Sequence, residues 1–210
     1  MLRIVSLFLV FTVALAGCTL FELPAAPGEL LFQDDFSRLS SGWDRDRDQA
    51  YRSDYVDGFY RIEILQAETT AWTNPGLMFG DVRIEVDAGK SAGPDDNAYG
   101  VICRYQDPDN YYFFLISSDG FAGIGVRRQG AAVLLTGEAM LPSEPVVLGA
   151  GPNHLRADCV GSRLSLFVNG IAASEAEAFD WTEGDVGLIA GSYAEGGVVI
   201  DFDNFSVVHP

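Results

Sequence analysis

Short runs of β-branched and aromatic residues, separated by Gly, Asn, Asp and Pro, extend from residue 30 to the C-terminus. Residues 60–64 (YRIEI) and 82–87 (VRIEVD) alternate apolar and charged side chains, which is the pattern of strands with one face in water. Turn sequences at 118–120 (SDG), 161–162 (GS) and 169–170 (NG) separate neighbouring runs as hairpins do. No segment keeps a helical period, so the pattern predicts an all-β, antiparallel two-sheet sandwich or jelly roll.

Length and composition limit the classes of protein to which the chain can belong. Its 210 residues fit one large all-β domain, and 48% hydrophobic residues are enough for a core, which excludes a disordered chain. The formal net charge of −17 would repel a phosphate backbone, so we expect no nucleic-acid partner.

The N-terminus has the features of an export signal. Arg3 precedes an apolar stretch over residues 4–16, which is too short to span a bilayer and predicts a helical signal peptide over residues 1–17. The sequence that follows, Leu15-Ala16-Gly17-Cys18, resembles the bacterial lipobox, in which the Cys is acylated and becomes the new N-terminus. The alternative is ordinary cleavage after Ala16.

Acylation of Cys18 would supply more than one acyl chain, and multiple chains give stable membrane anchoring. Residues 18–29 contain Pro24, Pro27 and Gly28 and are typical of a tether, which leaves residues 30–210 for the folded domain. We therefore expect an exported lipoprotein, held at the cell membrane or outer membrane by its lipid and facing away from the cytoplasm.

Two cysteines remain in predicted strands, Cys103 and Cys159. Exported proteins retain disulfides, so we expect these two to pair if their strands are neighbours. The alternative is a pair of buried free thiols that act as small hydrophobic side chains.

Several short segments occur along the chain in an order that resembles a known superfamily. They are FQDDFS (32–37) with GW (42–43), DGFYRI (57–62), YGVICRY (99–105), NYYFF (110–114), LFVNG (166–170), GL (187–188) and DFDNF (201–205). Over residues 30–208 this order is similar to the concanavalin A-like lectin/glucanase superfamily, in the branch of laminin G-like and 3-keto-disaccharide hydrolase domains. The resemblance implies a concanavalin A-like jelly roll, a fold that hosts lectins, hydrolases and adhesive modules.

Glu85 and Asp87 are the weak candidates for a catalytic pair, because at strand spacing their side chains share one face about 7 Å apart. The related glucanases have Glu-x-Asp-x-Glu, and here Gly89 stands in the third place. The alternative is a solvated strand face. His154 and His209 provide neither a nucleophilic triad nor a zinc-ligand spacing.

Calcium is the one cofactor for which the sequence offers ligands. Asp107 and Asp109 stand in a predicted turn, while Asp201 and Asp203 share one face of the last strand. Turns and strand ends select the same residues for structural reasons, so our expectation is that no cofactor is needed.

Carbohydrate binding requires aromatic faces and a few polar groups on one concave surface. The candidates are Arg104, Tyr112, Trp72 and Trp181, with Tyr105 as a further aromatic residue of the same kind. The alternative for each is core packing or an ion pair. Arg104 stands out because a guanidinium in so apolar a strand needs a carboxylate partner or a polar groove. We expect a carbohydrate or glycan-bearing partner; the alternatives are a hydrolase of glycosidic or 3-keto sugars and a structural or adhesion module without a sugar site.

Overall fold

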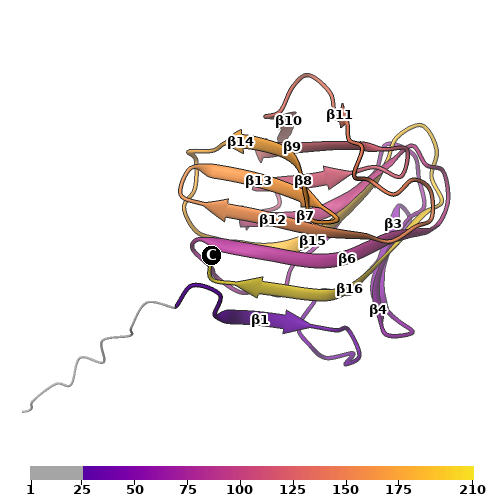
Figure 1. Ribbon diagram of the computed structural model, residues 1–210. Helices are drawn as coiled ribbons and strands as arrows, with labels where there is room; N and C mark the ends of the chain where they lie inside the picture. The colour runs from indigo at the N-terminus through magenta and orange to yellow at the C-terminus, as the bar shows by residue number, and fades with distance from the viewer. Residues whose placement is uncertain (1–25) are drawn as a thin grey trace, which may run out of the picture.

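The computed structural model describes residues 26–210; the predicted signal peptide, Cys18 and most of the tether lie outside this range. The described residues form sixteen strands arranged in two antiparallel sheets (Figure 1). They contain no helix long and apolar enough to cross a membrane. The predicted all-β sandwich is therefore confirmed.

The larger sheet has nine strands, and β16 lies near its middle. The first half of β16 pairs with β4, its second half pairs with β1, and β6 pairs along its other edge. The strands of the larger sheet, in spatial order, are β14 (Ile171–Glu177), β13 (Arg163–Val168), β12 (Asn153–Val160), β6 (Val82–Ala92), β16 (Val198–Val208), β4 (Phe59–Ile64), β3 (Tyr51–Val56) and β2 (Asp46–Arg47), with β1 (Leu30–Asp34) beside β16.

The smaller sheet has seven strands and forms the second layer in Figure 1. Three strands that are consecutive in the chain, β7, β8 and β9, pair with one another as two antiparallel hairpins. Its strands, in spatial order, are β10 (Ala131–Leu134), β9 (Phe121–Arg128), β8 (Asn110–Ile116), β7 (Asn97–Asp107), β15 (Asp185–Ser192) and β5 (Thr70–Thr73), with β11 (Leu141–Pro142) beside β9.

The core lies between the two sheets and follows from the alternation in the sequence. In β6, Val82, Ile84 and Val86 are fully or almost fully buried while the charged residues between them are partly exposed. Burial of such aliphatic side chains, at about 25 cal/mol per Å² of apolar surface, is the main force that holds the sheets together. Each sheet therefore presents a second, outer face.

Cys103 in β7 and Cys159 in β12 form a disulfide, as predicted. Their strands are not neighbours in one sheet: β7 belongs to the smaller sheet and β12 to the larger. The bond crosses the core, with both residues completely buried and their Cα atoms 6.9 Å apart. It therefore links the two layers.

Candidate ligand-binding face

Three aromatic side chains from three strands gather on the outer face of the smaller sheet. The ring of Tyr111 in β8 lies 5.6 Å from that of Trp72 in β5 and 5.7 Å from that of Tyr105 in β7, with which it stacks. Tyr111 is 2% exposed, whereas Trp72 and Tyr105 are partly exposed. We call these three residues the aromatic platform: Trp72 and Tyr105 present its surface, and Tyr111 supports them.

Arg127 in β9 supplies the positive charge of this face. Its guanidinium carbon is 5.8 Å from the centre of the Trp72 ring, within range of a cation–π interaction. Burial raises the pKa of Tyr111 to about 12, and Arg127 offsets part of that rise. The Tyr111 hydroxyl is therefore neutral at physiological pH.

An apolar hollow of about 210 Å³ adjoins the platform. Gly123 and Gly125 of β9 leave room for side chains that line the hollow. A Cβ atom at Gly125 would lie 2.2 Å from Cζ of Phe113, and one at Gly123 would lie 3.1 Å from Cγ of Met140. The residues that line it are Thr70, Tyr111, Phe113, Leu115, Arg127, Ala132, Val133, Leu134, Met140, Ile189 and Tyr193.

A polar hollow of about 390 Å³ also adjoins the platform, because Trp72 lines it, and it meets the apolar hollow at Thr70. Asp44, Arg45 and Asp46 line it, and Asp46 accepts a hydrogen bond from the Tyr51 hydroxyl at 2.5 Å. The platform thus borders a polar hollow and an apolar hollow.

The outer face of the larger sheet has a different character, because its charges are paired. Arg61 and Asp201 form a two-pronged ion pair at 2.6 and 2.8 Å. Asp158 accepts hydrogen bonds from both Arg156 and Arg83. Such a ladder of pairs is the usual solution for a solvated sheet face.

Glu85 and Asp87 lie on this paired face, next to His154 of β12. Nδ1 of His154 is 2.8 Å from Asp87, and its Nε2 is 3.8 Å from Glu85. Asn204 donates a further hydrogen bond to Asp87 at 2.9 Å. Asp87 and His154 line a hollow of about 440 Å³ on this face, with Asp201, Asp203 and Asn204. Neither Glu85 nor Asp87 belongs to the aromatic platform or the apolar hollow.

The expectation that Arg104 lines a groove is wrong. Its side chain is 1% exposed and donates hydrogen bonds to Asp81 at 3.1 Å and to the carbonyls of Trp181 and Gly161. Strict alternation after Ile102 would have placed it outside. A β-bulge after Cys103 and a φ of 50° at Arg104 redirect it inward, where Asp81 is the carboxylate partner.

Tyr112 and Trp181 are also core residues, contrary to the prediction. Tyr112 is completely buried, and its hydroxyl donates a hydrogen bond to Asp180 at 2.9 Å. The Trp181 ring packs 5.1 Å from that of Tyr112, against the main core. Of the candidate sugar contacts, Trp72 and Tyr105 lie on the outer face, where their role as contacts stays a prediction.

The candidate calcium ligands are engaged in local structure. Asp107 accepts hydrogen bonds from the backbone of Asp109 and from the Asn110 side chain, which closes the β7–β8 turn. Asp201 pairs with an arginine, and Asp203 accepts from the backbone of Asn204. Within residues 26–210 no three His, Cys, Asp or Glu side chains gather as a metal ion would require.

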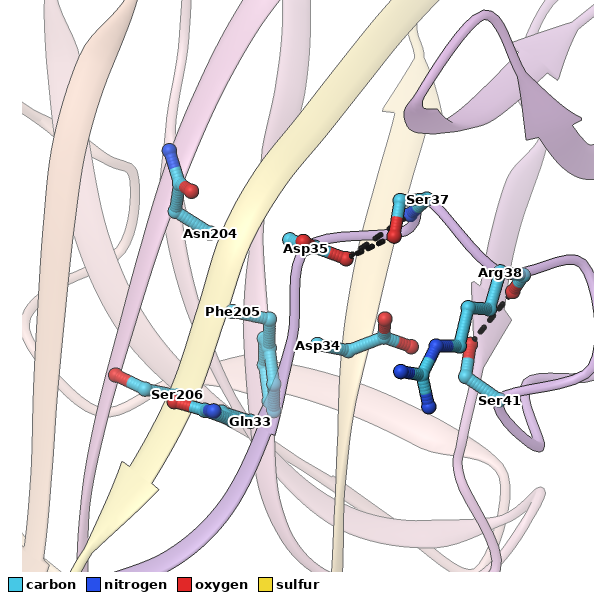
Figure 2. A pocket seen from close by; sticks show the side chains of 9 residues that line it. All are labelled: Gln33, Asp34, Asp35, Ser37, Arg38, Ser41, Asn204, Phe205 and Ser206. Atoms are coloured by element: carbon cyan, nitrogen blue, oxygen red, sulfur yellow. Dashed lines mark hydrogen bonds between the residues drawn. The ribbon is translucent and has the colours of Figure 1, made fainter.

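A second polar hollow, of about 470 Å³, lies beside the turn after β1 (Figure 2). Asp34 accepts hydrogen bonds from Nε1 of Trp43 at 2.9 Å and from the backbone of Phe36 at 2.8 Å. Asp35 binds both the backbone and the hydroxyl of Ser37. These carboxylates fix the turn, so the FQDDFS…GW segment is structural. The hollow is lined by Gln33, Asp34, Asp35, Ser37, Arg38, Ser41, Asn204, Phe205 and Ser206.

Sequence reasoning did not assign Tyr111 and Arg127 to the face. Their strands read as continuous apolar runs, in which the inward side cannot be distinguished from the outward side. The available signal was the row Gly123, Gly125 and Arg127, three alternate positions of β9 without an apolar side chain.

No protein-family model and no curated protein matches the chain. Solved structures do. Carbohydrate-binding module CBM66 from Bacillus subtilis is 16% identical with a TM-score of 0.56, over 80% of this chain and 96% of that one. A β-glucanase from Bacillus licheniformis is 12% identical with a TM-score of 0.61, over 87% and 99%. A Bacillus subtilis protein of unknown function with a galectin-like fold is 12% identical with a TM-score of 0.63, over 88% and 97%. These likenesses, together with the two antiparallel sheets, identify the domain as a concanavalin A-like jelly roll.

Proposed function

We propose that the protein binds carbohydrate on the outer face of the smaller sheet, with a sugar ring lying on Trp72 and Tyr105. The observation that carries the proposal is the aromatic platform itself. Apolar side chains that lie together and stay partly exposed on a sheet face mark interaction sites, unlike apolar residues scattered singly over a surface. Aromatic faces match the apolar face of a pyranose, and nearby polar groups fix its hydroxyls.

Charge narrows the ligand to a neutral glycan. The chain has a formal net charge of −17, and the polar hollow beside the platform is lined by Asp44 and Asp46 together with Arg45, whose charge is paired with Asp54. An anionic polysaccharide would be repelled by this field, with Arg127 as the single cation of the apolar hollow.

Binding is favoured over hydrolysis by the lining of the apolar hollow. Glycosidases place two carboxyl groups across the scissile bond. None of the residues that line the apolar hollow is Asp or Glu, and of the two carboxylates that line the polar hollow, Asp46 is held by the Tyr51 hydroxyl and the backbone of Arg47. The printed names of the similar structures include both a carbohydrate-binding module and glycosidases, so the fold is compatible with either activity.

We also propose that the domain lies outside the cytoplasm and is attached to a membrane through lipid on Cys18. This proposal rests on the lipobox-like residues 15–18 and the tether that follows. In cells fed labelled palmitate, the full-length protein should carry label and sediment with membranes. Cys18→Ser should abolish both; a labelled Cys18→Ser protein, or unlabelled full-length protein, would contradict the anchor.

A glycan and polysaccharide array with the purified protein, run with and without calcium, tests the binding function. Trp72→Ala should abolish the signals, whereas Phe179→Ala should retain them, because Phe179 is an exposed aromatic residue that lines neither hollow of this face. No binding to any neutral glycan would overturn the proposal in favour of an adhesion or structural role. Release of reducing sugar from a bound polysaccharide would instead support a hydrolase.

A further inference from the structure

Two loops contribute side chains to the apolar hollow. The loop before β11 and the loop after β15 meet at its lining, where the hydroxyl of Tyr193 contacts the sulfur of Met140 at 3.7 Å. Leu134 and Ile189 add further aliphatic surface. The hollow beside the aromatic platform is therefore lined largely by hydrocarbon and thioether groups.

One polar atom in this region lacks a partner. Nε of Arg127 is buried and has no hydrogen-bond acceptor among the described residues. Arg127 forms a distant ion pair with Asp109, in which Nε of Arg127 is 3.9 Å from Oδ1 of Asp109. This distance is too long for a hydrogen bond. Nε itself has no accessible surface, but the Arg127 side chain is 28% exposed and lines the hollow, so the terminal N–H groups of its guanidinium are the donors that an acceptor on a bound ligand can reach.

The two features together specify the chemistry of what can enter. A plain hexose presents hydroxyl groups on its edges, and hydroxyls packed against Leu134, Met140 and Ile189 would lose hydrogen bonds to water without replacement. A carboxylated sugar is disfavoured by the acidic surroundings described above. An acylamino substituent is neutral and offers both a methyl group for the hydrocarbon surface and a carbonyl oxygen for Arg127.

We propose that the apolar hollow holds the acyl group of an N-acylated sugar whose ring lies on the aromatic platform, with the exposed part of the Arg127 guanidinium donating to the acyl carbonyl. This inference rests on the proposed carbohydrate binding and adds the ligand class. It assigns separate roles to adjoining parts of one face: the platform binds the ring, and the hollow selects the substituent.

Calorimetric titration of the purified protein with matched oligosaccharides tests the inference. Chains of N-acetylglucosamine should bind at least about tenfold more tightly than the corresponding chains of glucose. The acylated sugar gains one buried methyl group and one hydrogen bond from a charged donor, which glucose lacks. A 6-deoxy sugar, which offers a methyl group without the carbonyl, should bind less tightly than the acylated one. Equal binding of the two would overturn the role of Arg127.

Two substitutions locate the preference. Met140→Gln keeps the length of the side chain but replaces hydrocarbon surface with an amide, and it should reduce the ratio of the two affinities to below about threefold. Leu148→Gln is the matched control: Leu148 is 66% exposed and lies outside the hollow, so the ratio should not change.

The failures of the two proposals are distinguishable. Binding of glucose and N-acetylglucosamine chains with equal affinity would overturn the acyl inference and leave carbohydrate binding intact. A preference that survives Met140→Gln unchanged would place the acyl group elsewhere and also overturn it. Binding of neither kind of chain, nor of any other neutral glycan, would overturn the underlying function.

Discussion

Trp72 and Trp181 lie on opposite sides of β8. Trp72 packs on Tyr111 at 5.6 Å on the outer face of the smaller sheet, and Trp181 packs on Tyr112 at 5.1 Å on the core side. The two supporting tyrosines are consecutive residues of one strand, so their side chains point in opposite directions. Two tryptophans of similar burial therefore have different expected roles.

Trp72→Ala should weaken binding of the best array ligand at least about tenfold, because loss of a stacking surface costs more than about 1.4 kcal/mol. Trp181→Ala should leave the affinity of the folded protein unchanged but lower the free energy of unfolding by about 3 kcal/mol through a core cavity. Titration and urea unfolding of both variants separate these effects. Equal losses of affinity would show that the face is not the site.

The buried guanidinium of Arg104 should make Asp81 important for stability. Asp81 accepts hydrogen bonds from Arg104 and from the backbone of Gly161, and its own side chain is 42% exposed. Asp81→Ala should lower the free energy of unfolding by about 1–2 kcal/mol, since solvent and two carbonyls still screen the cation. Arg104→Met combined with Asp81→Ala should cost less than the sum of the single losses. Strict additivity in urea unfolding would argue against the coupling.

The disulfide should contribute about 4 kcal/mol to stability in the loop-entropy account, because it closes a loop with a sequence separation of 56 residues. The double variant Cys103→Ala, Cys159→Ala should therefore unfold at lower urea concentration than the oxidised protein. Reduction of the wild type should shift its midpoint in the same direction. A shift below about 1 kcal/mol would mean that the link adds little to a sandwich already held by its core.

Acid should destabilise the domain in part through Asp54. The hydrogen bond from Arg45 lowers the pKa of Asp54 from 3.8 to about 2. Its contribution to folding is therefore complete above pH 4 and is lost as the pH falls toward 2, and it amounts to no more than about 2 kcal/mol. Asp54→Asn should be less stable than wild type at neutral pH and nearly equal to it near pH 2. A constant difference in unfolding free energy across this range would contradict the assignment.

The fold could be predicted from sequence because strand alternation and turn residues are local. The turns at 161–162 and 169–170 connect β12 to β13 and β13 to β14, as expected. The pairing of Cys103 with Cys159 was also predictable, although its course across the core was not.

The site was harder to predict because a shift of one residue exchanges the two faces of a strand. The sequence points to Tyr112 as a sugar contact, whereas its neighbour Tyr111 belongs to the aromatic platform. A run of four aromatic residues gives no indication of which side of the strand faces inward. Arg104 was misplaced because the bulge that redirects it depends on a positive φ at a non-glycine residue. Neither feature has a signature in a single sequence.

The most direct test of the account uses the indole N–H signals of the three tryptophans in a ¹⁵N–¹H NMR spectrum. Each signal can be assigned by replacing Trp43, Trp72 or Trp181 with Phe in turn. Titration with a glycan that binds on the array should shift the signal of Trp72 and leave those of Trp43 and Trp181 in place. A shift of Trp181 without Trp72, or binding that moves none of the three, would contradict carbohydrate recognition on this face.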